Sequence, residues 1–208
     1  MLREVLAGQS TEVRGCILKS SLLDRFCPEV LEAVCFPDRT SPPKLGGREL
    51  VQLLQQDHLF TISLDARGEW FRFHHLFQNL LKRQLQQSAS EEEIATLQSR
   101  ASAWFESQGL ITESIKHALA ADDVGLAAEV VERYRKNELD ADRWYVVERW
   151  LAMLPAEVRE RRPGLLMAEG WVEYARFRLE RIVPITEKVA RLLENQVADP
   201  SVERELAR

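Results

Sequence analysis

The stretch W-F-R-F-H-H-L-F-Q-N-L-L, residues 70–81, decides the fold of the first part of this chain. Phe71 and Phe73 alternate with Arg72 and His74, as apolar and polar side chains do in a half-buried strand. The apolar residues that follow recur at helical spacing and are Leu76, Phe77, Leu80, Leu81 and Leu85. The sequence therefore predicts a strand that leads directly into an amphipathic helix.

Two adjacent histidines, His74 and His75, stand at this junction. A pair of this kind is ordinarily structural, with one ring packed and the other partly solvated. The residues of the pair alone therefore favour a structural role over a functional one.

Upstream of the junction the pattern predicts three helices and a first strand. The helices begin at Ser10 or Thr11, at Pro28 and at Arg48, where capping residues or proline precede apolar periodicity. A loop rich in proline and glycine, residues 37–47, separates the last two. Residues 59–64 form a strand that pairs with residues 70–73 across a loop containing glycine. Three helices followed by a two-stranded hairpin is the layout of a winged helix.

Winged helices often bind DNA through their third helix, so this alternative is weighed here. The predicted third helix, R-E-L-V-Q-L-L-Q-Q-D, has Arg48 as its only cation. Gln52, Gln55 and Gln56 could contact adenine, but phosphate neutralisation needs several cations. The sequence therefore argues against DNA binding by this domain.

From about Ser90 onward the pattern is entirely helical. Ser90 and the three glutamates after it resemble a capping box, and Gly109 is a typical helix terminator. The later helices are predicted at 111–121, 124–135, 144–154, 163–176 and 178–194. Short loops between them indicate stacked helical hairpins, and the spacing around Trp104 and Gly109 is that of a tetratricopeptide-like (TPR-like) pair. Large aromatics are expected in the packing, namely Trp144, Trp150 and Trp171, and the alternative is that one of them lines a concave ligand surface.

The predicted fold is therefore mainly α: a winged-helix domain at residues 1–87, followed by a TPR-like α-solenoid at residues 88–208. The first segment has 11 Lys and Arg against 10 Asp and Glu, and the second has 17 against 23, so neither is a basic surface for nucleic acid. Cys16, Cys27 and Cys35 match no zinc spacing and are expected to be buried free thiols. With no signal peptide and no bilayer-spanning run, we expect a cytoplasmic chain without a membrane partner.

The motifs of self-sufficient catalysis are absent from the sequence. Gly46-Gly47 is not followed by the Lys-Ser/Thr of a P-loop, and no dinucleotide fingerprint, His-Glu-x-x-His or nucleophile elbow occurs. The four histidines do not form a metal spacing with the carboxylates. We therefore expect no enzyme activity, no catalytic residues, no metal site and no cofactor in this chain itself.

Five runs of residues resemble the MalT-like large ATP-binding regulators of the LuxR family, which are signal-transduction ATPases of the STAND class. V-R-G-C-I-L-K-S-S-L-L-D-R-F (13–26), L-x-x-D-H-L-F-x-I-S-L-D (54–65) and W-F-R-F-H-H-L-F (70–77) carry it in the first segment. G-L-I-T-E-S-I-K-H-A-L-A-A-D-D (109–123) and W-L-A-M-L-P-A-E-V-R-E-R-R-P-G-L-L (150–166) carry it in the second. The resemblance covers nearly the whole chain, and its pieces occur in the same order.

The resemblance implies a longer parent protein with an N-terminal nucleotide-binding domain that holds ATP or ADP, a winged helix, a superhelical sensor domain and a C-terminal DNA-binding domain. This chain would supply the winged helix and the start of a truncated superhelix. Its implied partners are the parent's own nucleotide-binding domain and, on the helical repeats, a small-molecule inducer or a protein. DNA would be bound only through the absent C-terminal domain.

The resemblance also gives the histidine pair a function. In related switch ATPases a histidine of the winged helix, in a Met-His-Asp-Leu context, contacts the phosphates of bound ADP. Phe73-His74-His75-Leu76 can be aligned with that pattern, which places His74 at the histidine. His75 stands where the related motif has aspartate, so either His74 or His75 is implied as the phosphate-sensing residue. The structural alternative is a histidine that ties the hairpin to the helix.

Two functions of different classes follow from these observations. The first is a regulatory segment of a transcriptional regulator, in which the winged helix controls a nucleotide-dependent switch and the repeats bind an inducer or partner. The second is a free-standing TPR-like adaptor that binds proteins without any ATPase. The size of the native protein distinguishes them.

Overall fold

The computed structural model describes residues 9–36, 46–56 and 61–197. The chain divides into two compact units, residues 1–110 and residues 111–208. Most of the predicted loop at 37–47 and the first two residues of the predicted strand at 59–64 lie outside the described residues.

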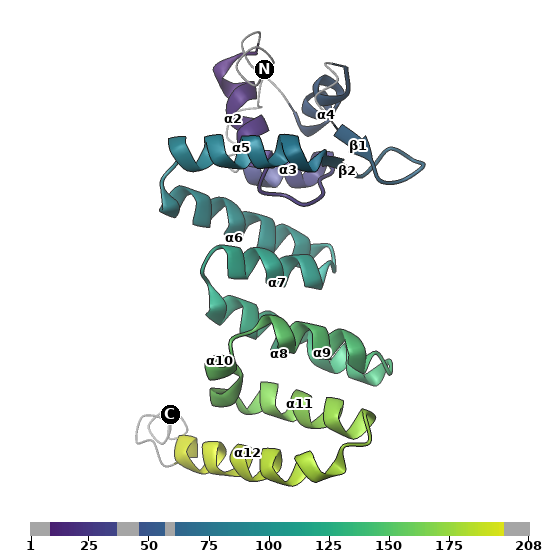
Figure 1. Cartoon of the computed structure of the whole chain (residues 1–208), viewed down its shortest axis with the longest axis vertical. Helices are drawn as coiled ribbons and strands as arrows, with labels where there is room; N and C mark the ends of the chain where they lie inside the picture. The colour runs from purple at the N-terminus through teal and green to yellow at the C-terminus, as the bar shows by residue number, and fades with distance from the viewer. Residues whose placement is uncertain (1–8, 37–45, 57–60, 198–208) are drawn as a thin grey trace, which may run out of the picture. The chain divides into compact units, whose positions relative to one another are not determined.

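The described part of the first unit contains five helices and a hairpin (Figure 1). Its elements are α2 (Thr11–Ser20), α3 (Pro28–Cys35), α4 (Gly47–Gln56), β1 (Thr61–Ser63), β2 (Phe71–Phe73), α5 (His75–Ser88) and α6 (Glu91–Ser107). Ser10 caps α2 by accepting the N–H of Val13 at 3.3 Å, and Pro28 opens α3, both as predicted. The order of helices and hairpin confirms the predicted winged helix.

The second strand is held from both sides. β1 pairs antiparallel with β2, so that Thr61 lies opposite Phe73 and Ser63 opposite Phe71. On the other side Phe26 exchanges both backbone hydrogen bonds with Phe71, each at 2.8 Å. The ring of Phe26 is fully buried, and its centroid lies 4.9 Å from that of Phe73. The aromatic face predicted for this strand is therefore the centre of the first core.

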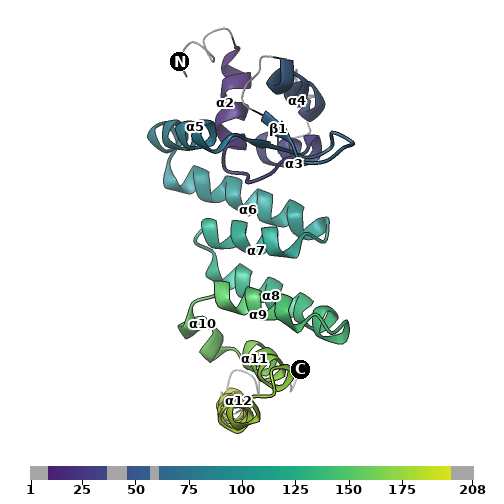
Figure 2. The ribbon, with the colours of Figure 1, turned by 45° about the vertical axis from the view of Figure 1, so that its right-hand side comes forward.

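The hairpin loop is closed by one carboxylate. Asp65 accepts the backbone N–H groups of Glu69 at 3.0 Å and Trp70 at 2.8 Å. These backbone hydrogen bonds lower the pKa of the Asp65 carboxyl, because they stabilise its charged form. Gly68 has a φ of +66°, a conformation that favours glycine. The loop projects away from the helices in both views (Figures 1 and 2).

The helix α6 belongs to the first compact unit. Ser90 caps it by accepting the N–H of Glu93 at 3.1 Å, as predicted. Trp104 and Phe105 pack against Trp70 at the base of the hairpin, with centroid distances of 6.2 and 6.5 Å. The sequence pattern grouped this helix with the solenoid instead. The division into domains at 87/88 stays a prediction, while the compact unit extends to Leu110.

At the start of α4, Gly47 lies so close to the backbone of α3 that a side chain would not fit without a shift. A Cβ added there would lie 2.1 Å from the carbonyl oxygen of Pro28. The backbone N–H of Gly47 donates to Glu32 Oε1 at 3.1 Å. We expect Gly47→Ala to destabilise the chain by about 1–3 kcal/mol, because backbone must shift to admit the methyl group. Gly15→Ala is the matched control, since a Cβ there meets no heavy atom within 4 Å. That change should stabilise α2 by about 0.5–1 kcal/mol.

Urea unfolding of both variants, followed by circular dichroism, tests this pair. Equal stability of the two variants would contradict the close approach of α4 to α3.

The described part of the second unit is a stack of helices that run back and forth (Figure 1). The elements are α7 (Ile111–Ala120), α8 (Val124–Asp140), α9 (Trp144–Met153), α10 (Ala156–Arg161), α11 (Pro163–Ala175), the 3-10 helix η1 (Leu179–Arg181) and α12 (Ile182–Val197). Four pairs of helices pack against each other in sequence: α7 with α8, α8 with α9, α9 with α11, and α11 with α12. This arrangement confirms the predicted solenoid.

Small and β-branched residues form the core between α7, α8 and α9. Ala118, Ala127 and Ala128 are fully buried and allow the helices to approach closely. Trp150 is the largest fully buried side chain in this unit, and its Nε1–H donates to Thr112 Oγ1 at 2.8 Å. The predicted burial of Trp150 is confirmed.

Two predicted helices differ from the observed ones. α8 continues to Asp140 rather than ending at residue 135, because no helix-breaking residue intervenes before the turn. The predicted helix at 178–194 is replaced by η1 and α12, in which Pro184 occupies the first turn, where a missing N–H costs little. The short helix α10 was not predicted.

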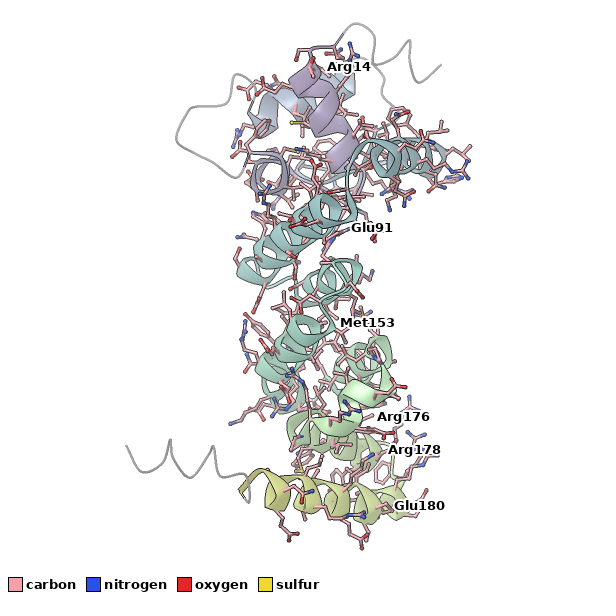
Figure 3. All side chains as sticks on the ribbon, turned by 90° about the vertical axis from the view of Figure 1, so that its left-hand side faces the viewer. Arg14, Glu91, Met153, Arg176, Arg178 and Glu180 are labelled. Carbon is pink, nitrogen blue, oxygen red and sulfur yellow. The ribbon has the colours of Figure 1, made fainter. Side chains whose placement is uncertain are left out.

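Left-handed residues terminate the helices in both units. Gly109, the predicted terminator, has a φ of +71°, and Asp122, Asp142 and Phe177 adopt φ values of 57–60°. In each case the next residue donates its N–H back to the last turn, for example Arg143 to the Glu138 carbonyl at 2.8 Å. Figure 3 labels Arg176 and Arg178 on either side of the last of these turns.

No helix in the described ranges is both long and apolar enough to cross a membrane.

Candidate nucleotide-sensing site and ligand surface

The first site lies where β2 meets α5. Phe73 at the end of the strand and Phe77 in the first turn of the helix are both buried, and their rings meet edge to face at 5.7 Å. These two anchors fix the backbone between them. His74 occupies the N-cap position of α5 and His75 the first helical position. The structure therefore places both predicted residues at the N-terminus of one helix.

The two imidazole rings lie side by side at this helix N-terminus. Their centroids are 4.4 Å apart and their planes are inclined by 33°. His74 is half-buried, and His75 is exposed. The side chain of His74 makes no capping hydrogen bond to the helix. The first N–H groups of a helix lack intrahelical acceptors, so they and an imidazole N–H can together bind a phosphate oxygen.

A glutamine one turn later secures the helix to the rest of the domain. Gln78 Nε2 donates to the carbonyl oxygens of Ser21 and Leu23, both at 2.9 Å. The backbone N–H of Gln78 donates to the His74 carbonyl at 2.9 Å. Because Leu23 is fully buried, the position of His74 is coupled to the loop between α2 and α3. The site is thus held by the core rather than by a flexible loop.

A third residue belongs to the site, although the sequence reasoning did not single it out as functional. Arg72 lies on the same strand face as His74, two residues earlier, and is exposed. Within residues 9–36, 46–56 and 61–197, no ion pair of Arg72 is found. An exposed guanidinium two residues before His74 in the sequence suits a phosphate ligand. The signal that could have identified it is the period of two along the strand.

The face of α4 that would contact DNA in a DNA-binding winged helix lies beside a cavity with more carboxylates than cations. Arg48, Gln52 and Gln55 on α4 line a cavity of about 570 Å³ that carboxylates of Glu29 and Glu69 also line. Other lining residues are Trp104 of α6 and Gln108, the C-cap residue of that helix. Arg48 is the one cation among the described lining residues. A face with more carboxylates than cations is unsuited to a phosphate backbone, in agreement with the sequence argument.

The second site is an apolar surface on α11 and α12. Trp171 and Tyr174 are 55% and 57% exposed, so the prediction that Trp171 is a core residue is wrong. The two rings meet edge to face at 5.9 Å. They line a cavity of about 290 Å³ whose other residues are Met167, Gly170, Ile182, Ile185 and Thr186. Helical periodicity placed Trp171 on an apolar face, but it could not tell whether a neighbouring helix covers that face.

A more polar cavity adjoins this one. It measures about 420 Å³, and Met167 and Trp171 line both. Its remaining residues include Arg135, Lys136 and Asp140 of α8. Arg135 donates to the carbonyl oxygen of Glu132, whereas the exposed Lys136 has no ion pair among the residues that the structure describes. We call the two cavities together the Trp171 surface. Its aromatic centre has cations on one side and aliphatic residues on the other.

The chain is similar to known proteins of two kinds. Residues 2–93 match the family described as the MalT winged helix domain. The serine/threonine-protein kinase PknK of Mycobacterium tuberculosis is 30% identical over 182 residues, which are 88% of this chain and 15% of the kinase. The HTH-type transcriptional regulator MalT of Klebsiella pneumoniae is 26% identical over 182 residues, 88% of this chain and 19% of that protein. MalT of Cronobacter sakazakii is 24% identical over 199 residues, 96% of this chain and 21% of that protein.

These matches identify the class of domain first: residues 2–93 match the MalT winged-helix domain family. More narrowly, the predicted resemblance to the MalT-like regulators is confirmed over most of the chain. The chain spans about a fifth or less of the length of these curated relatives.

Proposed function

We propose that this chain is the regulatory segment of an ATP-dependent, LuxR-type transcriptional regulator. In this proposal the winged helix controls a nucleotide-dependent switch, and the helical repeats bind the inducer or a protein partner. ATP or ADP occupies the parent's own nucleotide-binding domain, which contacts the winged helix. The chain itself has no catalytic role.

The observation that carries the proposal is the pair of histidines at the uncapped start of α5. The two histidines place imidazole donors at the N-terminus of α5, and the exposed cation of Arg72 lies two residues before His74 in the sequence. Such a set favours an anion. A phosphate held there would fix the winged helix against the nucleotide, and its loss would release the winged helix. The switch is then a population shift between a closed and an open arrangement.

The names of the relatives support a regulatory role for this region rather than a role in kinase activity or in DNA binding. A region similar to this chain occurs in proteins named as a protein kinase and as transcriptional regulators. It occupies only 15–21% of each of these proteins. A region shared by proteins with such different outputs is better explained as a part that regulates than as the part that performs either output.

The native size of the protein tests the proposal against the adaptor alternative. An antibody raised against this chain should detect, in the source cells, a band several times larger than the 24.0 kDa of the chain. Nucleotide should co-purify with that larger protein. A native band of about 24 kDa with no bound nucleotide would overturn the regulator and leave the helical-repeat adaptor.

We propose the Trp171 surface as the place on the repeats where a ligand binds. Its two cavities have the size of small-molecule sites, and a large aromatic ring stands at their junction. Arg135 and Lys136 on one side and Ile182 and Ile185 on the other suit a ligand with an anionic group and an apolar body. Because Trp171 is more than half exposed, its removal should leave the fold intact.

An aromatic sulfonate dye, anilinonaphthalene sulfonate, is the probe for this surface. We expect Trp171→Ala to weaken dye binding about three- to tenfold, the loss of one aromatic contact. The measurement is a fluorescence titration of the chain with the dye. Tyr145→Ala is the matched control, because Tyr145 is 57% exposed and lines neither cavity. Equal weakening in both variants, or in neither, would exclude the Trp171 surface as the dye site.

A further inference from the structure

Two cysteines meet between the first two described helices of the winged helix. Cys16 lies in the middle of α2, and Cys35 is the last residue of α3. The thiol of Cys35 donates to the carbonyl oxygen of Cys16, with 3.7 Å between sulfur and oxygen. Both residues are free thiols, 4% and 9% exposed. They lie 19 positions apart in sequence but belong to the same contact between helices.

A cavity leads to both residues. It measures about 310 Å³ and is lined by Cys16, Cys35, Thr11, Glu12, Gly15, Lys19 and Phe36. The face of α2 beside Cys16 is open, since a Cβ added at Gly15 would meet no heavy atom within 4 Å. A small oxidant can therefore enter, although the residues themselves are largely buried. Cys27, the third cysteine, does not line this cavity.

The two thiols differ in acidity. The contact with the Cys35 thiol and the nearby ammonium of Lys19 lower the pKa of the Cys16 thiol, against the opposing effects of burial and of Glu12. The contact with the Cys16 thiol, together with burial, raises the pKa of Cys35 well above its usual value. Burial raises the pKa of Cys27 to about 12. A thiol of lowered pKa beside one of raised pKa is the arrangement of an attacking and a resolving cysteine.

We propose that Cys16 and Cys35 are a peroxide-sensitive dithiol that closes to a disulfide between α2 and α3. The Cys16 thiolate attacks one oxygen of hydrogen peroxide, the O–O bond breaks, and the products are a sulfenic acid and hydroxide, which takes up a proton to give water. The Cys35 sulfur, losing its proton, attacks the Cys16 sulfur. The S–S bond forms as the S–O bond breaks, and the hydroxyl group leaves as water with that proton. Peroxide is reduced by two electrons, and the two thiols are oxidised.

The disulfide would tie the helix before Phe26 to the helix after it. Phe26 lies between α2 and α3 and bridges to β2, so the oxidised form would restrain the core that carries the histidine site. We expect a higher unfolding temperature for the oxidised chain, because the link removes conformations from the unfolded state.

Peptide mapping after peroxide treatment tests the proposal on the unmodified chain. Free thiols are blocked with N-ethylmaleimide, and the chain is digested with trypsin and then with a glutamate-specific protease. Trypsin leaves Cys16 in residues 15–19 and the other two cysteines together in residues 26–39; cleavage after Glu29 and Glu32 separates those two. We expect a linked Cys16–Cys35 peptide and a blocked, unlinked Cys27. Absence of any link, or a link to Cys27, would overturn the proposal.

Three variants refine the test. Cys27→Ser is the matched control and should form the disulfide at the unmodified rate. Cys35→Ser should halt at the sulfenic acid of Cys16, which dimedone traps. Cys16→Ser should leave Cys35 unoxidised, because burial still raises the pKa of the Cys35 thiol when the Cys16 thiol is gone. Dimedone labelling of Cys35 in that last variant would contradict the assigned order of attack, and mapping of the unmodified chain does not depend on whether any variant folds.

Discussion

In the intact regulator, replacement of His74 by alanine is expected to release ADP about ten- to a hundredfold faster, the loss of one charge-assisted hydrogen bond. His74 is the N-cap residue of α5, half-buried and held by Phe73 and Phe77 on either side. Its imidazole can therefore reach a phosphate with little loss of side-chain entropy. The dissociation rate of a fluorescent ADP analogue, measured in a stopped-flow chase with unlabelled ADP, gives the effect directly.

Two further variants decide between the histidines and control for the fold. His75→Ala should change the rate less than His74→Ala, because His75 is exposed whereas His74 is half-buried. The reverse order would move the phosphate contact to His75. Asn79→Ala, at an exposed position on the same helix, should leave the rate unchanged. Unchanged rates in both histidine variants would leave the pair with a structural role only.

The second large effect concerns the helical repeats. Trp150→Ala should destabilise the second unit by about 3–5 kcal/mol, a large share of the stability of an ordinary domain. Trp150 is 2% exposed, and its Nε1–H donates to Thr112 Oγ1. The substitution therefore leaves both a cavity and a hydroxyl without its indole donor. Urea unfolding of the chain, followed by tryptophan fluorescence and by circular dichroism, measures the loss.

The matched control for Trp150→Ala is Trp171→Ala, the same change at a residue that is 55% exposed in the same unit. Its cost should stay below about 1 kcal/mol, as is usual for surface substitutions. Trp150→Phe should fall between the two, because the ring is kept and the hydrogen bond is lost. If Trp171→Ala proved as costly as Trp150→Ala, the Trp171 surface would be part of a packed interface instead of an open ligand surface.

Local patterns predicted the elements of this chain well. Ser10 and Ser90 cap helices as expected, Gly109 ends α6, and the alternation in residues 70–74 gives a strand followed by a helix. Each of these signals depends on neighbours within a few positions in the sequence. All three cysteines are buried free thiols, as predicted from spacings that match no zinc site and from the usual burial of unpaired cysteine.

Contacts between distant segments were beyond those patterns. The rings of Trp104 and Phe105 pack against Trp70, and no local pattern reveals that α6 completes the first core. Helical periodicity marked Trp171 as apolar-facing, but the exposed face belongs to the last helices of the described stack. The adjacency of Cys16 and Cys35 likewise depends on how α2 and α3 meet.

The histidine site was likewise predicted from the sequence only in part. The sequence placed two histidines at a strand-to-helix junction, and their resemblance to a phosphate-sensing motif suggested a role. The 4.4 Å separation of the two rings and the lack of a capping hydrogen bond from His74 could be found only in three dimensions. Both depend on side-chain directions, which the sequence does not give for a histidine at this position.

Hydrogen exchange across residues 71–78 of the whole protein, with and without ADP, shows whether the winged helix senses the nucleotide. The first N–H groups of α5 have no acceptor in the helix, so they should exchange quickly when the site is empty. If the winged helix binds the ADP phosphates, saturating ADP should slow exchange at His75 and Leu76, and His74→Ala should abolish the slowing. Equal exchange in both states, in a protein shown to bind ADP, would contradict a nucleotide-sensing winged helix.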